Sequence, residues 1–325
     1  MAMRIGADVG GTFTDVVLEV EDDSTSGPEM FSTKVLTTDE APEQGILDGV
    51  RTVAAEAGAN LADLDTFIHG TTLATNALIS RTGARTALVT TDGFRDTIEM
   101  RTESRFEQYD LNLVLPAPLI QRSDRHVLRE RLAADGTVLR PFDEEEARLL
   151  VEALADRPDD EAYEAVAVGF IHAYVDGTHE RRFRDLLLER LPDVAVSISS
   201  EVAPQMREFE RFNTACTNAY LQPLMATYLH RLADDLAATG ARCPVYLIHS
   251  GGGLVSVDTA ARFPVRLVES GPAGGAIFAA DIAARHGLDR VLSYDMGGTT
   301  AKICLIEDHT PRTAKTFEVA RTHRF

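Results

Sequence analysis

One short phrase occurs twice in this chain, and it limits the fold more than any other feature. Asp8-Val-Gly-Gly-Thr12 lies near the start and Asp295-Met-Gly-Gly-Thr299 near the end, an offset of 295 − 8 = 287 residues. Each copy lies between two apolar runs and predicts a strand, a tight glycine turn and a return strand. Such a hairpin needs no ligand by itself. The recurrence with matching flanks favours a paired site, where glycine turns and strand-end carboxylates hold a metal-bound polyphosphate.

The charge balance narrows the range of partners. The 325 residues include 51 Asp and Glu against 32 Lys and Arg, which gives a formal net charge of −19. An acidic surface repels phosphate backbones and anionic lipids, so we expect neither nucleic acid nor a membrane as a partner. The N-terminus leads directly into a strand, and the chain contains no apolar run of about 20 residues. These features predict an acidic cytoplasmic protein.

The N-terminal part of the chain predicts a meander followed by alternating helices and strands. Strand alternation covers residues 3–9, 14–20, 30–36, 67–70 and 86–90. A helix is expected from Pro42 to about Ala57, closed by Gly58, and another begins at Thr71. A three-stranded meander joined to right-handed crossover units gives one mixed sheet covered by helices, so the expected fold class is α/β.

Four segments are expected along the whole chain. They are a first core at 1–93, an inserted and completing segment at 94–200, a largely helical segment at 201–289, and the start of a second core at 290–325. The second core is expected to contain a hairpin over 290–306 and a third strand at 313–319. A meander without helices leaves its faces uncovered. We therefore expect the front part of a longer protein, with an incomplete second domain, or a subunit that needs another chain.

Five sequence blocks in a fixed order carry a resemblance to a known family. The blocks are Asp8 to Asp15 (DVGGTFTD), His69 to Asn76 (HGTTLATN), Gly93 to Asp96 (GFRD), Glu269 to Gly275 (ESGPAGG) and Asp295 to Thr300 (DMGGTT). Together they resemble the hydantoinase A / ATP-dependent 5-oxoprolinase family, which includes N-methylhydantoinase A. The resemblance implies an actin-like ATPase fold with duplicated ribonuclease-H-like domains and mixed sheets, in agreement with the duplicated hairpin.

The resemblance also implies an activity, that of an ATP-dependent cyclic-amide hydrolase that uses Mg²⁺. Phosphorylation of the amide oxygen of a 5-oxoproline or hydantoin type of substrate converts a poor leaving group into a good one. A second, hydantoinase B-type subunit is the expected partner, and a homo-oligomer stays open. Two other functions also stay open: a sugar or small-acid kinase of the same superfamily, and a noncatalytic scaffold or truncated nucleotide-binding subunit.

Particular residues receive roles from the same resemblance. Asp8 and Asp295 are expected to orient water ligands of magnesium, and Asp15 is either catalytic or a hairpin residue that bonds to its own turn. The expected phosphate contacts are Gly10, Gly11 and Thr12 in the first copy and Gly297, Gly298, Thr299 and Thr300 in the second. The candidates for substrate contact are His69, Thr71, Thr72, Arg95, Arg105 and Arg207.

Each substrate candidate also has a structural interpretation. The threonines after His69 can cap a helix or receive an anion at its N-terminus. Arginine binds carboxylates bidentately, but Arg95 and Arg105 also fit a solvated charged loop. Arg207 and Arg211 have helical spacing and can form a surface ion-pair set instead. The particular lactam or carbonyl substrate therefore stays open.

Overall fold

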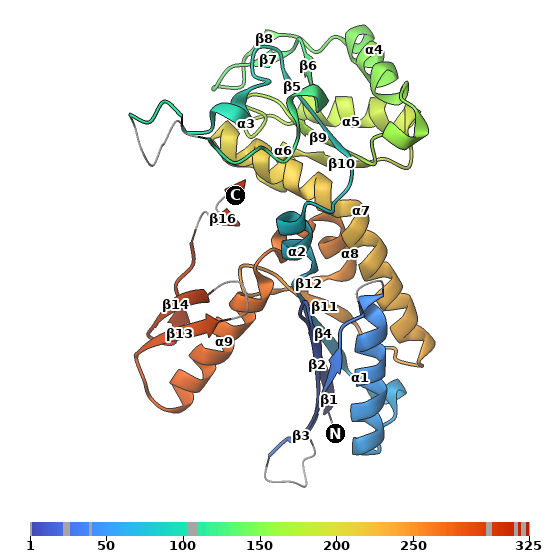
Figure 1. Ribbon diagram of the computed structural model, residues 1–325, viewed down its shortest axis with the longest axis vertical. Helices are drawn as coiled ribbons and strands as arrows, with labels where there is room; N and C mark the ends of the chain where they lie inside the picture. The colour runs from blue at the N-terminus through green and yellow to red at the C-terminus, as the bar shows by residue number, and fades with distance from the viewer. Residues whose placement is uncertain are drawn as a thin grey trace. The chain divides into compact units, whose positions relative to one another are not determined.

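The computed structural model describes residues 2–21, 27–38, 41–102, 109–112, 114–296, 301–314, 318–319 and 323–324 (Figure 1). These residues divide into two compact units. The first comprises Met1–Ala77 and Met225–Lys315, and the second comprises Leu78–Leu224 and Thr316–Phe325. The first unit is therefore built from two distant parts of the sequence.

The first unit contains a six-stranded mixed sheet in the order β12-β11-β4-β1-β2-β3. Its strands are β1 (Ala2–Val9), β2 (Phe13–Glu21), β3 (Glu29–Leu36), β4 (Thr66–Thr71), β11 (Val245–Ile248) and β12 (Leu254–Ser256). The first three form the expected antiparallel meander, β4 pairs in parallel with β1, and β11 pairs in parallel with β4. Strand β11 thus joins this sheet only after the chain has passed through the second unit.

Two helices bury one face of this sheet. Buried and more exposed side chains alternate along β1 and β2, as the period of a strand requires. Helix α1 (Pro42–Ala57) begins at a proline and ends at Gly58, whose φ of +63° suits glycine. Gly49 of α1 lies so close to Val16 of β2 that a Cβ atom at position 49 would come within 2.5 Å of the valine side chain. The C-terminal part of α7 (Glu208–Ala238) covers the same face.

The second hairpin lies in another sheet of the first unit, formed by β13 (Arg290–Met296), β14 (Ala301–Glu307) and β15 (Thr310–Pro311). Helix α9 (Ser270–Arg285) packs against β13 and β14 (Figure 1). The expected third strand at 313–319 is wrong for residues 313 and 314, which belong to no strand, and its residues 315–317 lie outside the described residues. Asp308 and His309 form a two-residue turn with positive φ, so the return strand already begins at Thr310. Glu318–Val319 (β16) pairs instead with His323–Arg324 (β17).

The second unit contains a four-stranded parallel sheet in the order β10-β9-β5-β6. Its strands are β5 (Thr86–Thr91), β6 (Arg125–Leu128), β9 (Ala165–Gly169) and β10 (Ala195–Ile198). The expectation that β5 belongs to the same sheet as the meander is wrong. Every side chain of β5 is buried, which is typical of a parallel strand covered on both faces, but such a run does not identify its neighbours.

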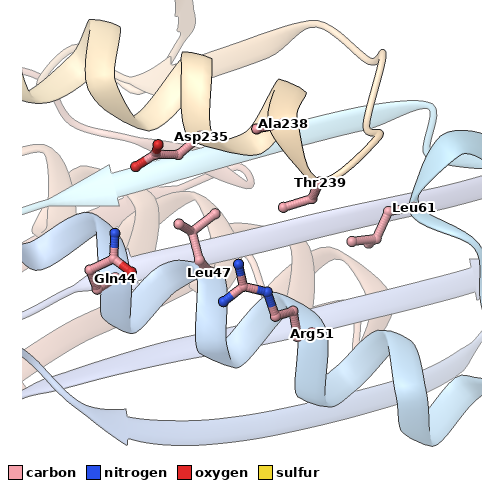
Figure 2. Close-up of a pocket in the computed structure, with 7 residues that line it drawn as sticks. All are labelled: Gln44, Leu47, Arg51, Leu61, Asp235, Ala238 and Thr239. Atoms are coloured by element: carbon pink, nitrogen blue, oxygen red, sulfur yellow. The ribbon is translucent and has the colours of Figure 1, made fainter.

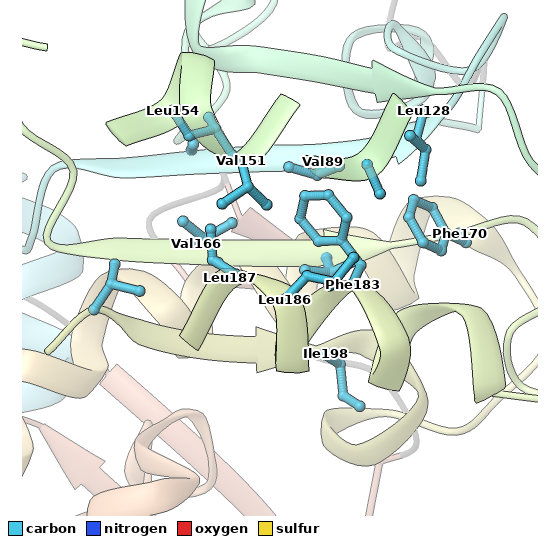
Figure 3. Close-up of a cluster of buried hydrophobic side chains, with 14 of the residues drawn as sticks. Val89, Leu128, Val151, Leu154, Val166, Phe170, Phe183, Leu186, Leu187 and Ile198 are labelled. Atoms are coloured by element: carbon cyan, nitrogen blue, oxygen red, sulfur yellow. The ribbon is translucent and has the colours of Figure 1, made fainter. Parts of the chain in front are cut away.

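Helices α4 (Glu144–Ala155) and α5 (Thr178–Arg190) cover the parallel sheet and form a hydrophobic core with it (Figure 3). Val166 of β9 packs with Leu187 of α5 and Val151 of α4 in this core.

The remaining elements of both units are short. They are η1 (Leu61–Asp63), α2 (Leu73–Ser80), α3 (Thr97–Met100), η2 (Arg122–Asp124), β7 (Arg131–Leu132), β8 (Val138–Arg140), η3 (Asp159–Glu161), α6 (Ser199–Val202), α8 (Val257–Arg262) and η4 (Pro264–Leu267). Within the described ranges, no helix has the length and apolar character needed to cross a lipid bilayer.

A buried ion pair fixes the carboxyl end of the parallel sheet. Arg211 and Glu180 are fully buried, and their side-chain nitrogen and oxygen atoms lie 3.7 Å apart. Glu180 accepts hydrogen bonds from the N–H groups of Phe170 (2.9 Å) and Ser200 (2.8 Å), and Arg211 donates to the Phe170 carbonyl (2.9 Å). The interpretation of Arg211 as part of a surface ion-pair set is therefore wrong. It joins α7 to the ends of two strands, and removal of either charge would leave the other buried and unpaired.

Candidate functional site

The two glycine hairpins have the same strand register. Asp8 pairs with Asp15 in the first hairpin, and Asp295 pairs with Lys302 in the second. Adding the offset of 287 to both members of the first pair gives the second pair, and the same relation holds for every pair along β13 and β14. Both expected hairpins are confirmed, and the repetition extends from the sequence to the pairing of the strands.

The first glycine turn is held from two sides. The N–H of Gly10 donates to the Phe13 carbonyl (3.0 Å), which closes the turn. Thr37, just after β3, donates its hydroxyl to the Gly10 carbonyl (3.0 Å) and its N–H to the Thr12 carbonyl (2.9 Å). Gly11 and Thr12 stay exposed at the tip. The turn is thus a fixed loop that presents its tip to the surroundings, and the Gly10 N–H is already used within it.

Asp8 is the last residue but one of β1 and lies beside the backbone of Gly70 in β4. A Cβ atom at Gly70 would come within 2.8 Å of the Asp8 Oδ1 atom, so only glycine leaves room for this carboxylate. Asp8 is exposed, yet the surrounding protein removes part of its hydration, and this desolvation is the largest of the causes that raise its pKa. The charges of Asp15 and Asp295 raise the pKa further, against an opposing effect of Lys34. The charge of the second copy thus contributes, after burial and Asp15, to the raised pKa of Asp8.

The second strand of each hairpin carries a different charge. In the first copy, the Asp15 carboxylate accepts a hydrogen bond from the Lys34 ammonium of β3 at 2.7 Å, and both side chains are exposed. In the second copy, Lys302 forms an ion pair with Glu269, the residue before α9. Gly297, Gly298, Thr299 and Thr300, the expected phosphate contacts of the second turn, lie outside the described residues.

The block that begins at His69 connects β4 to β1. His69 is fully buried, with Nδ1 at 3.0 Å from the Ala7 carbonyl oxygen and Nε2 at 2.7 Å from the Tyr228 hydroxyl. Thr71 is also buried, and Thr72 donates both its N–H and its hydroxyl to the Val9 carbonyl (3.0 and 3.2 Å). Both threonines are thus used in hydrogen bonds within the first unit, and His69 is buried with both ring nitrogens bonded to protein groups.

None of the arginine candidates belongs to the described part of the first unit. Arg95 and Arg207 belong to the second unit, and Arg105 lies outside the described residues. Arg207 is exposed and has a φ of +92°, an uncommon value for a residue with a side chain. Its carbonyl accepts the N–H of Arg211 (3.1 Å) in the first turn of α7. The role of these arginines as substrate contacts stays a prediction.

A surface hollow of about 330 Å³ lies elsewhere in the first unit (Figure 2). It lies between α1 and the end of α7, and its lining residues are Gln44, Leu47, Arg51, Leu61, Asp235, Ala238 and Thr239. Arg51 and Asp235 give it opposite charges, and none of its lining residues belongs to a glycine turn. This hollow therefore adds nothing to the site built around Asp8.

The mixed sheet and the paired glycine hairpins define a class of fold, the α/β actin-like ATPase fold. Residues 4–191 match the model of the hydantoinase/oxoprolinase N-terminal region, and residues 211–324 match the hydantoinase/oxoprolinase model. The chain belongs to the hydantoinase/oxoprolinase family.

Several relatives have names that state an activity. The chain is 33% identical over 308 residues to caprolactamase subunit alpha of Pseudomonas jessenii, covering 93% of this chain and 43% of the relative. The solved caprolactamase structure superposes with a TM-score of 0.80 at 32% identity, over 93% of this chain and 43% of that one. Nucleotide-free acetone carboxylase gives a TM-score of 0.79 at 25% identity, over 94% of this chain and 44% of that one.

A longer relative is 5-oxoprolinase 1 of Arabidopsis thaliana, at 30% identity over 326 residues, 93% of this chain and 25% of the relative. The chain thus spans less than half the length of each of these three relatives.

Proposed function

We propose that the two glycine hairpins bind ATP, and that this chain forms the nucleotide-binding part of an enzyme that activates a cyclic amide or a related carbonyl compound. One observation carries the proposal. Asp8 and Asp295 occupy equivalent positions in two hairpins of the first unit that share one strand register, and the charge of Asp295 is among the causes that raise the pKa of Asp8. Carboxylates that converge from two glycine turns fit the two sides of a metal-bound polyphosphate. The caprolactamase and 5-oxoprolinase relatives support the enzyme class.

Magnesium is the proposed metal. In the part of the chain that the structure describes, no three His, Cys, Asp or Glu side chains are grouped so as to hold an ion by themselves. This fits Mg²⁺, which keeps several water ligands and is bound through one or two carboxylates together with phosphate oxygens. Asp8 and Asp295 would orient such waters. When bound, the ion would neutralise the charge on the phosphate oxygens.

The phosphate contacts would come from both turns. Gly11 and Thr12 at the exposed tip of the first turn are the proposed contacts on one side, while the Gly10 carbonyl stays bonded to Thr37 and keeps the turn in place. Gly297, Gly298, Thr299 and Thr300 are proposed for the other side by their correspondence in the repeat. Phosphoryl transfer depends mainly on such positioning and charge stabilisation.

The proposed reaction starts with transfer of the γ-phosphoryl group of ATP to the amide oxygen, which releases ADP. Water then attacks the activated carbon, and the carbon–nitrogen bond of the ring breaks to give a free amine and an acyl phosphate. A second water hydrolyses the acyl phosphate to a carboxylate and inorganic phosphate. The products are a ring-opened amino acid, ADP and phosphate. We further propose a hydantoinase B-type partner subunit and a cytoplasmic setting; the caprolactamase relative is itself named as a subunit.

The test is release of phosphate from ATP and Mg²⁺ by the longer protein that contains this chain, alone and with its partner subunit. The compounds to add are 5-oxoproline, hydantoin, N-methylhydantoin, caprolactam and a set of sugars. Stimulation by one of the lactams, with stoichiometric ring opening, is the expected result. Stimulation by a sugar alone would identify a kinase, and a folded complex without any turnover would favour a noncatalytic nucleotide-binding subunit.

A further inference from the structure

A chain of hydrogen bonds is buried beneath the first glycine hairpin, and the proposed reaction does not use it directly. It runs from the Ala7 carbonyl of β1 to His69 of β4 and on to Tyr228 of α7, with the distances of 3.0 and 2.7 Å given above. Thr71, two residues after His69 on β4, accepts the N–H of Leu73 on its Oγ1 atom (3.2 Å). All of these residues belong to the first unit.

The donor and the acceptor in each hydrogen bond of His69 follow from the chemical groups involved. A carbonyl oxygen can only accept, so His69 must carry its proton on Nδ1 and donate it to Ala7. The Nε2 atom of a neutral imidazole is then an acceptor, so the Tyr228 hydroxyl donates to it. One arrangement of protons therefore satisfies both hydrogen bonds of the His69 ring.

This hydrogen-bond chain ends at the peptide group next to Asp8. The Ala7 carbonyl belongs to the peptide bond that links Ala7 to Asp8, so its orientation helps to set the direction of the Asp8 backbone. On β4, His69 pairs with Ala7 and the following residue, Gly70, pairs with Asp8. The His69 ring faces α7 on one side of the sheet, while the Asp8 carboxylate lies over Gly70 on the other side.

We propose that His69 and Tyr228 are positioning residues, which hold the end of β1 so that Asp8 meets the metal-bound nucleotide; this proposal rests on the proposed ATP-binding function. The tyrosine hydroxyl locks the histidine tautomer, and the tautomer supplies the donor for Ala7. Catalysis of phosphoryl transfer is sensitive to small displacements of such a group, since a shift of about 1 Å can lower a rate about 100-fold.

The surroundings keep both groups in the required protonation state. Burial lowers the pKa of His69 to about 4, so the ring stays neutral near pH 7. Burial first, and then the negative charge of Glu43, raises the pKa of Tyr228, so its hydroxyl keeps the proton. Glu43 is itself buried at the start of α1 and lies 3.3 Å from Arg231 of α7.

Two substitutions at His69 test its two hydrogen bonds, to Ala7 and to Tyr228, separately. An asparagine amide reaches the place of Nδ1 and keeps a donor for Ala7, whereas a glutamine amide reaches the place of Nε2 and keeps only the contact with Tyr228. We expect H69N to keep kcat for ATP hydrolysis within about fivefold of the wild type and H69Q to lower it by more than about 20-fold, with KM for ATP within about twofold in both. Tyr228→Phe removes the tautomer lock and should lower kcat about tenfold.

A matched control lies in the second unit. There the Tyr163 hydroxyl donates to Asp124 (2.8 Å) and lies 3.3 Å from His126 Nε2, so Tyr163→Phe removes a comparable hydroxyl. It should leave kcat unchanged even where it lowers the melting temperature as much as Tyr228→Phe does. Equal losses of kcat in the two tyrosine variants, or an H69N enzyme as slow as H69Q, would overturn the proposal.

Crystal structures of the H69N and H69Q proteins provide a readout without activity. The Asp8 Oδ1 atom should stay over Gly70 in H69N and move away from it in H69Q. An unmoved Asp8 in H69Q would refute the positioning role, whatever the protein catalyses. A displaced Asp8 in a protein that neither binds nor hydrolyses ATP would instead refute the proposed function and leave the structural role of His69 established.

Discussion

The two glycine hairpins share their register but differ in what covers them. Val16 and Leu18 in the first hairpin are 0% and 1% exposed, whereas Ile303 and Leu305, at the corresponding places of the second, are 64% and 49% exposed. Helix α1 covers this face of the first hairpin. In the second hairpin the same face carries equally apolar side chains, but no described element buries them.

The opposite faces of the two hairpins differ in chemistry as well. Arg4 and Glu19 pair across the strands of the first hairpin and form an exposed ion pair at 3.2 Å. The corresponding pair in the second hairpin is Val291 and Ile306, and Ile306 is buried on the side where α9 packs. The first hairpin thus has one apolar face and the second has two. Strand pairing follows from the local sequence, whereas burial depends on the elements that pack against each face.

The largest expected effect tests whether both copies take part in one site. Asp8→Asn and Asp295→Asn should each lower kcat for ATP hydrolysis about 100- to 1000-fold, because each removes a carboxylate that is proposed to orient water ligands of the magnesium ion. Steady-state phosphate release by the longer protein measures this. Asp15→Asn should change kcat less than about threefold, since Asp15 is exposed and paired with Lys34. An equal loss in all three variants would make Asp15 part of the chemistry, and a normal rate in Asp295→Asn would remove the second copy from the site.

The next effect concerns stability and compares equivalent leucines. Leu18→Ala should lower the free energy of unfolding by about 2–5 kcal/mol, as expected for a fully buried leucine. Leu305→Ala in the 325-residue chain should cost less than about 1 kcal/mol, because its side chain is half-exposed. Urea unfolding of both variants gives the comparison. In a longer protein that contains this chain, the cost of Leu305→Ala should approach that of Leu18→Ala; an unchanged small cost there would mean that the apolar face stays open.

A pH effect belongs to the first copy alone. His69 has a pKa of about 4 in the folded protein against 6.5 ordinarily, so the unfolded chain binds a proton that the folded chain does not as the pH falls from 6.5 to 4. The free energy of unfolding should therefore fall by about 3 kcal/mol between pH 6.5 and pH 4. Above pH 6.5 this proton uptake does not destabilise the folded protein. H69N should lack this part of the acid sensitivity. Parallel curves of unfolding free energy against pH for the two proteins would contradict the buried, neutral state of His69.

The smallest expected change is a steric one at Gly70. Gly70→Ala places a methyl group within 2.8 Å of Asp8 Oδ1 and should lower kcat about tenfold by moving the carboxylate. Gly6→Ala, two residues before Asp8 in β1, meets no atom within 4 Å and should leave kcat within about twofold. Steady-state rates and melting temperatures of both variants are compared. If kcat fell equally in Gly6→Ala and Gly70→Ala, the loss would come from a general disturbance of the sheet and not from displacement of the Asp8 carboxylate.

Local patterns in the sequence predicted much of the first unit. The glycine turns and strand alternation gave both hairpins, and proline with Gly58 gave both ends of α1. The partner of His69 could not be predicted in this way, because Tyr228 lies 159 residues further along the chain, within a long helix that has no motif at that point. The same holds for the sheet to which β5 belongs, since a run of buried residues is compatible with any parallel neighbour.

The candidate site was predicted in part. The repeat predicted that Asp8 and Asp295 occupy equivalent places in two hairpins, and their shared role stays a prediction; the sequence did not indicate that Gly70 makes room for Asp8. It did not indicate Thr37 as the residue that holds the first turn either. Both contacts depend on how three strands of the sheet lie against one another, and a motif confined to one segment contains no information about that.

The absence of a side chain at Gly49 gives a rule for sequence searches. α1 approaches the first hairpin so closely that even an alanine at this position would clash with Val16. Ile303 occupies the corresponding place in the second hairpin and is larger by one carbon atom. A helix that covers the second hairpin in the same way would therefore need glycine at its point of contact, flanked at helical spacing by apolar residues. An amphipathic segment with a glycine at the centre of its apolar face is the pattern to search for in a partner or in an adjoining part of the protein.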